Sequence, residues 1–156
     1  NDPYVFIFED DAVLNVPFAQ MHNVVRDLEV VRPEWEIILF SVSQCAHTGG
    51  FVLLPCGTEL VRLDDFCGTY AMAVSGRVFD TIISRMNRAK KNENVDIDIY
   101  SKCSEIYLTL PFMSLVLSDQ SDIRKYDTTG DLEQVILCQE RLLVQTSSMA
   151  QDCTLQ

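Results

Sequence analysis

The sequence predicts an α/β domain in which a mostly parallel mixed sheet is flanked by helices. Short, unbroken apolar runs such as residues 4–8 and 37–40 have the length and the β-rich composition of strands buried on both faces of a sheet. Between such runs lie segments whose apolar residues recur at helical spacing, as in residues 18–28. Strands that alternate with helices along a chain indicate this fold class.

The first half of the chain begins with a strand at residues 4–8 and continues into a helix. Asn15 is expected to cap that helix, and Pro17 lies in its first turn. A second buried strand is expected at residues 37–41, after the break at Pro33. Two short strands, at residues 51–54 and 59–63, flank a predicted turn.

The second half repeats the alternation of strand and helix. A strand at residues 69–74 leads to Ser75, a residue type suited to capping the helix that follows. A short helix is expected near residues 95–98, then a strand at 106–110, and an amphipathic helix opens at Asp131. We expect residues 1–146 to form a single domain and residues 147–156 to form a polar tail.

Composition and charge narrow the classes of partner. The chain has 156 residues, of which 47% are hydrophobic, a normal content for a packed core. Its 12 Lys and Arg against 23 Asp and Glu give a formal charge of −11, which argues against nucleic acid as the main partner. No apolar stretch approaches the roughly 18 residues of a transmembrane helix, so no transmembrane segment is expected.

The cysteines point to a cellular location. None of the six lies in the close pairs typical of zinc or redox sites, so free thiols in a reducing, cytoplasmic compartment are expected. The spacing of Cys45, Cys56 and Cys67 leaves one disulfide open. A peripheral membrane site and the lumen of the secretory pathway also stay open as locations.

The acidic triplet Glu9-Asp10-Asp11, which directly follows the first predicted strand, is the most informative local feature. Open α/β sheets bind ligands beyond the carboxyl ends of their strands. Adjacent carboxylates repel one another unless a proton or a cation compensates them, and Mg²⁺ or Mn²⁺ can join such carboxylates to phosphate oxygens. The alternative is that the three residues are solvated turn or capping residues.

An ordered set of motifs over residues 4–124 resembles glycosyltransferase family 25, the lipopolysaccharide- and collagen-type sugar transferases of GT-A fold. The resemblance has four parts in the family's order: the strand ending in Glu9-Asp10-Asp11, the Trp-led apolar run at residues 35–40, Gly68-Thr69-Tyr70-Ala71 with Ser75, and Val95-Asp96 followed by Pro111 and Ser121-Asp122-Ile123. The resemblance implies a GT-A-like, Rossmann-related fold. Family members carry a nucleotide-binding strand and helix before the acidic strand, so we expect this chain to be a fragment of a longer domain.

The resemblance also implies an activity. The chain would be a metal-dependent inverting glycosyltransferase that moves a hexose from a nucleoside diphosphate sugar, with uridine diphosphate favoured, to a hydroxyl of a glycan or protein. The implied site residues are Asp11 and Glu9 for Mn²⁺ or Mg²⁺; Asp10, Asp11, Gly68, Thr69 and Tyr70 for the nucleotide sugar; and Asp96 as the catalytic base. Further ligand contacts are expected from Asp98, Asp122, Arg124 and His47.

Structural roles compete with these assignments. Helix capping is the alternative role of Asp96 and Asp98, and for Asp98 it is the favoured one. Residues 121–124 are as well explained by a surface turn, and His47 by an ordinary loop histidine. Core packing is the expected role of Trp35. The alternative function is a non-catalytic carbohydrate- or cation-binding relative with an incomplete donor site.

Overall fold

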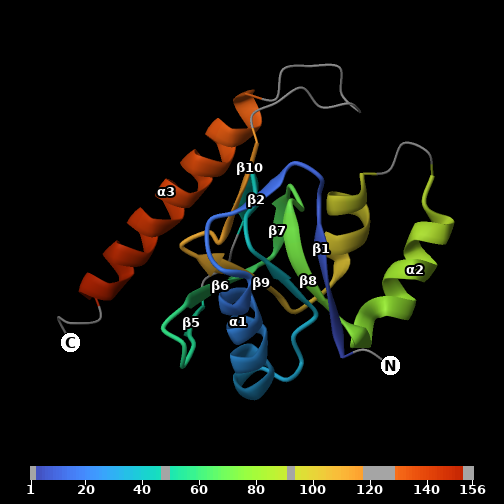
Figure 1. Ribbon diagram of the computed structural model, residues 1–156, viewed down its shortest axis with the longest axis horizontal. Coiled ribbons are helices and arrows are strands. Elements are labelled where there is room, and N and C mark those ends of the chain that lie inside the picture. The colour runs from blue at the N-terminus through green and yellow to red at the C-terminus, as the bar shows by residue number, and fades with distance from the viewer. Residues whose placement is uncertain (1–2, 47–49, 91–93, 118–128, 153–156) are drawn as a thin grey trace.

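A computed structural model describes residues 3–46, 50–90, 94–117 and 129–152, and its centre is a six-stranded sheet (Figure 1). In spatial order the strands are β1 (Tyr4–Phe8), β8 (Ala71–Ser75), β3 (Ile37–Leu39), β9 (Ile106–Leu110), β6 (Glu59–Leu63) and β5 (Phe51–Leu53). The expected α/β class with a mixed sheet is therefore confirmed.

The expectation that the sheet is mostly parallel is wrong. Of the five pairs of neighbouring strands in this sheet, only β3 with β9 is parallel, and the other four are antiparallel. An apolar run is typical of a buried strand, but it carries no information about the direction of the neighbouring strand. The short turn at residues 54–58 joins β5 to β6 as a hairpin, a connection too short for parallel strands.

Two small antiparallel sheets lie beside the main one. Strand β2 (Ala12–Leu14) pairs with β10 (Ser114–Val116), and β4 (Gln44–Ala46) pairs with β7 (Asp65–Cys67). Each of these strands has only three residues, too few for a visible apolar alternation, and the sequence analysis did not predict them.

Helices cover both faces of the main sheet. Ile38 of β3 packs in a core cluster with Met21 and Leu28 of α1 (Phe18–Val31), together with Trp35. The next residue, Leu39, faces a second cluster to which the other helices contribute. These are α2 (Phe79–Arg88), α3 (Thr129–Asp152) and the helical turns η1 (Gly76–Val78), η2 (Val95–Ile99) and η3 (Tyr100–Lys102). Within the described residues, no helix combines the length and the apolar character needed to cross a membrane.

Strand β1 was expected to be buried on both faces, and this expectation is wrong. Val5, Ile7 and Phe8 are 36%, 37% and 41% exposed, because β1 is an edge strand of the described sheet. Bonds from Glu9 N to the carbonyl of Tyr70 and from Gly76 N to the carbonyl of Pro3 show that odd-numbered residues of β1 face β8. The backbone groups of the even-numbered residues therefore point away from the sheet.

Two helix ends also differ from the expectations. Asn15 does not cap α1; Pro17 occupies the N-cap position, and the Asn15 amide instead donates to the carbonyl of Phe112 at 3.0 Å. The segment expected to be a tail from residue 147 is helical as far as Asp152. Ser75, as expected, accepts a hydrogen bond from Arg77 N at the turn that leads into α2.

Candidate functional site

Three of the sequence motifs meet at one point of the fold. The hydroxyl of Thr69 lies 2.9 Å from Oε1 of Glu9 and 2.9 Å from Oδ1 of Asp96. The backbone N–H of Gly68 donates to the other oxygen of Asp96, also at 2.9 Å. The structure thus brings together the acidic triplet, the Gly-Thr segment and the Val-Asp segment, which the sequence analysis had singled out separately.

The pairing of β1 with β8 places Glu9 beside Thr69. The register continues beyond both strands, since Glu9 N donates to the carbonyl of Tyr70 at 2.9 Å. A tight turn follows, closed by a bond from Ala12 N to the carbonyl of Glu9 at 3.1 Å. Asp10 is exposed in that turn. Asp11 is half-buried, with one carboxylate oxygen buried and its carbonyl accepting from Leu117 N.

Asp96 is held by the local geometry of η2. The side chain of Asn94 caps this turn by accepting from Asp96 N at 3.0 Å, and Asp98 accepts from Asn94 N at 2.7 Å. Arg85 of α2 donates to the carbonyls of Ile99 and Lys102, which ties the segment to the neighbouring helix. The carboxylate of exposed Asp98 therefore has the capping geometry that the sequence analysis weighed as its alternative role.

Only glycine fits at position 68. Its φ of +92° lies in the left-handed region, and a Cβ there would lie 2.9 Å from Ser43 Oγ and 2.9 Å from the ring of Tyr70. The close approach lets Gly68 N reach Asp96. Tyr70, expected to bind the nucleotide sugar, is 7% exposed and packs in the core, where its ring supports this loop.

The hydroxyl of Thr69 faces two carboxyl groups but has one proton to donate. It can therefore satisfy one carboxylate at a time, and the second short contact becomes a hydrogen bond only when that carboxyl group carries a proton. Two carboxyl groups around one hydroxyl also repel each other when both are ionised. A cation bound beside them would offset this repulsion.

Tyr100 lies near this pair of carboxyl groups and was missed in the sequence analysis. It is 6% exposed, and burial followed by the negative charge of Asp96 raises the pKa of its phenol, with Cys103 and Glu9 adding to the effect. The phenol therefore stays neutral and can act as a hydrogen-bond donor at neutral pH. Its position four residues after Asp96, one helical turn on, was the available sequence signal.

A divalent cation at the acidic turn would have to complete its coordination shell with a ligand and water. Within the described ranges, no group of three or more His, Cys, Asp or Glu side chains has the arrangement of a metal site. Mg²⁺ and similar ions that bridge to substrate phosphates need only one or two protein carboxylates, with water and phosphate completing the shell. Glu9 and Asp11, two residues apart at the turn, provide that kind of oxygen ligand.

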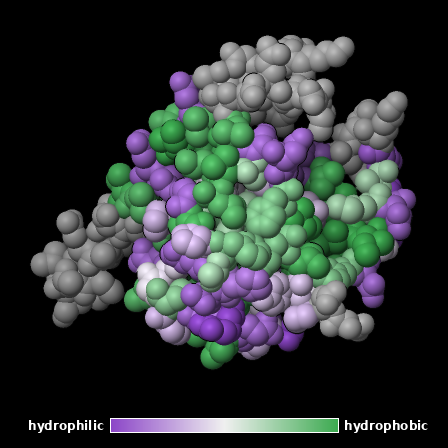
Figure 2. Space-filling model, in the orientation of Figure 1, coloured by the Kyte–Doolittle hydropathy of each residue, from purple (hydrophilic) through white to green (hydrophobic). Residues whose placement is uncertain are grey.

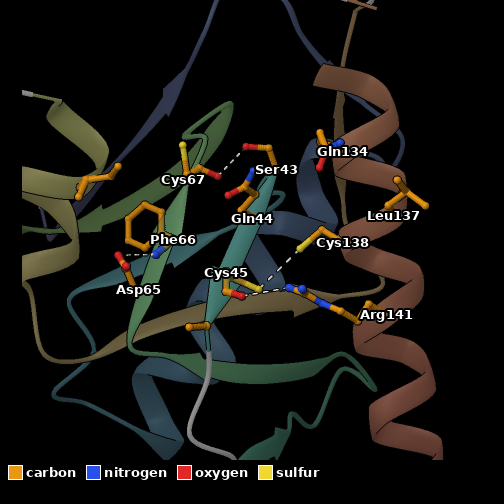
Figure 3. Close-up of a pocket in the computed structure, with 12 residues that line it drawn as sticks. Ser43, Gln44, Cys45, Asp65, Phe66, Cys67, Gln134, Leu137, Cys138 and Arg141 are labelled. Carbon is orange, nitrogen blue, oxygen red and sulfur yellow. Dashed lines mark hydrogen bonds between the residues drawn. The ribbon is translucent and has the colours of Figure 1, made fainter. Parts of the chain in front are cut away.

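A pocket of about 560 Å³ adjoins the site (Figure 3). Ser43, Cys67 and Ile97 line it, and these residues contact or neighbour Gly68 and Asp96. Polar groups from opposite walls also reach it, among them Gln44, Asp65, Gln134 and Arg141. Its volume is within the range of about 300–1,000 Å³ typical of small-ligand sites. The sequence analysis did not find this pocket, because its walls come from β4, β7, η2 and α3.

Three of the expected ligand contacts cannot be placed. His47, Asp122 and Arg124 lie outside the described residues. Trp35, for which core packing was expected, is fully buried, and its indole N–H donates to Glu29.

Comparison of this chain with protein-family models, with curated proteins and with solved structures finds no match.

Proposed function

We propose that the chain is a metal-dependent glycosyltransferase domain that moves a hexose from a nucleoside diphosphate sugar to a hydroxyl of a glycan or protein. The observation that carries the proposal is the convergence of Glu9, Thr69 and Asp96. These residues come from three separate motifs of the resemblance to glycosyltransferase family 25, and nothing in their sequence spacing requires them to meet.

Glu9 and Asp11 would hold Mn²⁺ or Mg²⁺ at the acidic turn. When bound, the ion offsets negative charge on the departing diphosphate. A chain with a formal charge of −11 needs such compensation to retain an anionic donor. The Thr69 hydroxyl lies between Glu9, which would be on the metal side, and Asp96, which would be on the acceptor side, and it donates its proton to one of the two carboxylates at a time.

Asp96 would receive the proton of the attacking hydroxyl. A general base must lie within hydrogen-bond reach of that hydroxyl, and it must be oriented by its neighbours. Gly68 N and Thr69 Oγ1 orient Asp96, and each of its oxygens keeps a lone pair for a further contact. The neighbouring pocket, with amide, carboxylate and guanidinium groups in its walls, suits the hydroxyls of a sugar.

The test measures binding and chemistry on the same chain. Melting temperatures are recorded with Mn²⁺ alone, with uridine diphosphate alone and with both, and hydrolysis of a uridine diphosphate sugar is followed with Mn²⁺. We expect a joint rise in the melting temperature and metal-dependent hydrolysis. Both should be lost in Asp11→Asn, which removes one negative charge from the metal ligands.

Asp27→Asn is the matched control, because it makes the same change of residue at a position outside the site. Asp27 lies on α1 and accepts a hydrogen bond from Cys56 N. It should retain both responses. No joint rise and no hydrolysis in the unaltered chain would refute the proposal. A joint rise without hydrolysis would instead favour the non-catalytic binding relative.

A further inference from the structure

Two cysteines that are distant in the sequence both line the pocket, and their side chains contact each other. The Sγ atoms of Cys45 on β4 and Cys138 on α3 lie 3.6 Å apart (Figure 3). Both belong to the described cysteines, all of which are free thiols in this structure. A disulfide requires about 2.05 Å, so the sulfurs need to approach by roughly 1.5 Å.

The contacts of α3 fix this pair in register. Val135, Cys138 and Leu142 form the buried stripe of the helix in the described part of the chain. Just after Cys138 in the helix, Gln139 accepts from Phe112 N at 2.6 Å and Arg141 donates to the carbonyl of Cys45 at 3.1 Å. The Arg141 bond reaches the backbone of the partner cysteine itself, so the helix cannot slide along β4 without breaking it.

The two thiols of the pair differ in pKa. The hydrogen bond from Cys45 and then the charge of Arg141 lower the pKa of Cys138 to about 7, against the opposing effect of burial. The same contact, together with burial, raises the pKa of Cys45. The lowered pKa favours the thiolate form of Cys138, and the thiolate is the form that attacks a disulfide.

We propose that Cys45 and Cys138 form a reversible disulfide that fastens α3 to β4 under oxidising conditions. With oxidised glutathione as the oxidant, the Cys138 thiolate attacks one glutathione sulfur, forms a mixed disulfide and releases one glutathione thiolate. Cys45 then loses its proton and attacks Cys138 Sγ, which forms the intramolecular bond and releases the second glutathione. In sum, two protein thiols lose two protons and two electrons, and one oxidised glutathione becomes two reduced molecules.

The bond would change the stability of the chain and the mobility of the pocket walls. It would close a loop from residue 45 to residue 138, and closing a long loop removes conformational freedom from the unfolded state. The link also joins opposite walls of the pocket, because Cys45 and Cys138 both line it. This inference is independent of the proposed sugar transfer.

The experiment equilibrates the purified chain in glutathione buffers from fully reduced to fully oxidised. Remaining thiols are alkylated, the chain is digested, and the peptides are identified by mass spectrometry. We expect a linked Cys45–Cys138 peptide in the oxidised buffer, and a melting temperature about 5–10 °C above that of the reduced chain. Cys56→Ser, which removes an exposed thiol, should leave both results unchanged.

Cys45→Ser should abolish the linked peptide and the glutathione dependence of the melting temperature. Peptide mapping of the unaltered chain decides the question even if that variant folds poorly. Alkylation of both Cys45 and Cys138 in the oxidised buffer, or the pairing of either with another cysteine, would overturn the proposal. A linked peptide without a rise in melting temperature would refute the fastening of α3.

Discussion

The backbone N–H of Gly68 donates a 2.9 Å hydrogen bond to Oδ2 of Asp96, and this bond joins the loop before β8 to the η2 turn. The bond depends on the absence of a side chain at position 68, where Ser43 and Tyr70 lie close by. Gly68, whose backbone leaves no room for a side chain, thus also orients Asp96, the carboxylate that we propose as the base.

Gly68→Ala should destabilise the chain by about 3–5 kcal/mol, since it adds both left-handed strain and a steric overlap. Gly57→Ala is the control: Gly57 has a φ of +83°, but a Cβ there would have no atom within 4 Å, so its cost should be only about 1 kcal/mol from strain. Urea unfolding measures both values. Equal losses in the two variants would contradict the steric argument.

Asp96→Asn should lower the free energy of unfolding by about 1–3 kcal/mol. The amide offers one acceptor oxygen, whereas Gly68 N and Thr69 Oγ1 need two. If Asp96 is the base, sugar transfer should also fall by roughly 10²–10⁴-fold while donor affinity is retained. Asp98→Asn keeps an acceptor for Asn94 N and should affect neither quantity strongly. Parallel loss of donor affinity and transfer would leave Asp96 with a positioning role only.

Stability should fall at high pH through Tyr107. Burial and then the hydrogen bond from its hydroxyl to Glu105 raise the pKa of Tyr107 from 10.0 to about 12. The folded state holds the phenol proton of Tyr107 more tightly than the unfolded state does. The contribution of this group to the free energy of unfolding is therefore complete below pH 10 and is lost between about pH 10 and pH 12. Urea midpoints from pH 9 to pH 11.5 should therefore fall less steeply in Tyr107→Phe. An identical pH dependence of the urea midpoint in Tyr107→Phe and in the unaltered chain would refute the assignment of this loss of stability to Tyr107.

Alkylation of Cys138 by iodoacetamide should rise with pH about a midpoint near 7. Arg141→Gln removes the positive charge that favours the thiolate, and so should move the midpoint toward 9.0, the ordinary value. Peptide mapping after short exposure to the reagent measures each cysteine separately. An unchanged midpoint in Arg141→Gln would show that the charge of Arg141 does not reach the thiolate.

The local elements were largely predictable because each has its own sequence signal. Strands β3, β5, β6 and β9 and helix α1 lie where the apolar patterns and the breaks at proline and glycine indicated. Strand direction was not predictable in this way. Strand β8 runs antiparallel to both β1 and β3, and this depends on packing between segments distant in the sequence.

The candidate site was predictable only in part. Glu9, Thr69 and Asp96 were chosen from motifs, and the structure shows them in contact. The pair Cys45 and Cys138 left no sequence signal, because their approach depends on how α3 packs against β4. Burial of Tyr70 likewise follows from the loop at Gly68 rather than from any local pattern.

Strand β1 forms an edge of the main sheet in the part of the chain that the structure describes, and we expect this edge to pair with a second copy of the chain. Figure 2 shows hydrophobic side chains at the surface on the side where β1 and α2 lie, and Ile7, Ile83 and Met86 line a small apolar groove there. An unprotected apolar edge is a template on which a strand of a second copy can add. The weight-average molar mass from light scattering should thus increase with protein concentration, and Ile7→Lys should suppress the increase by placing a charge on the edge strand. The apolar run that makes β1 easy to recognise in the sequence would thereby also be the surface through which copies of the chain associate.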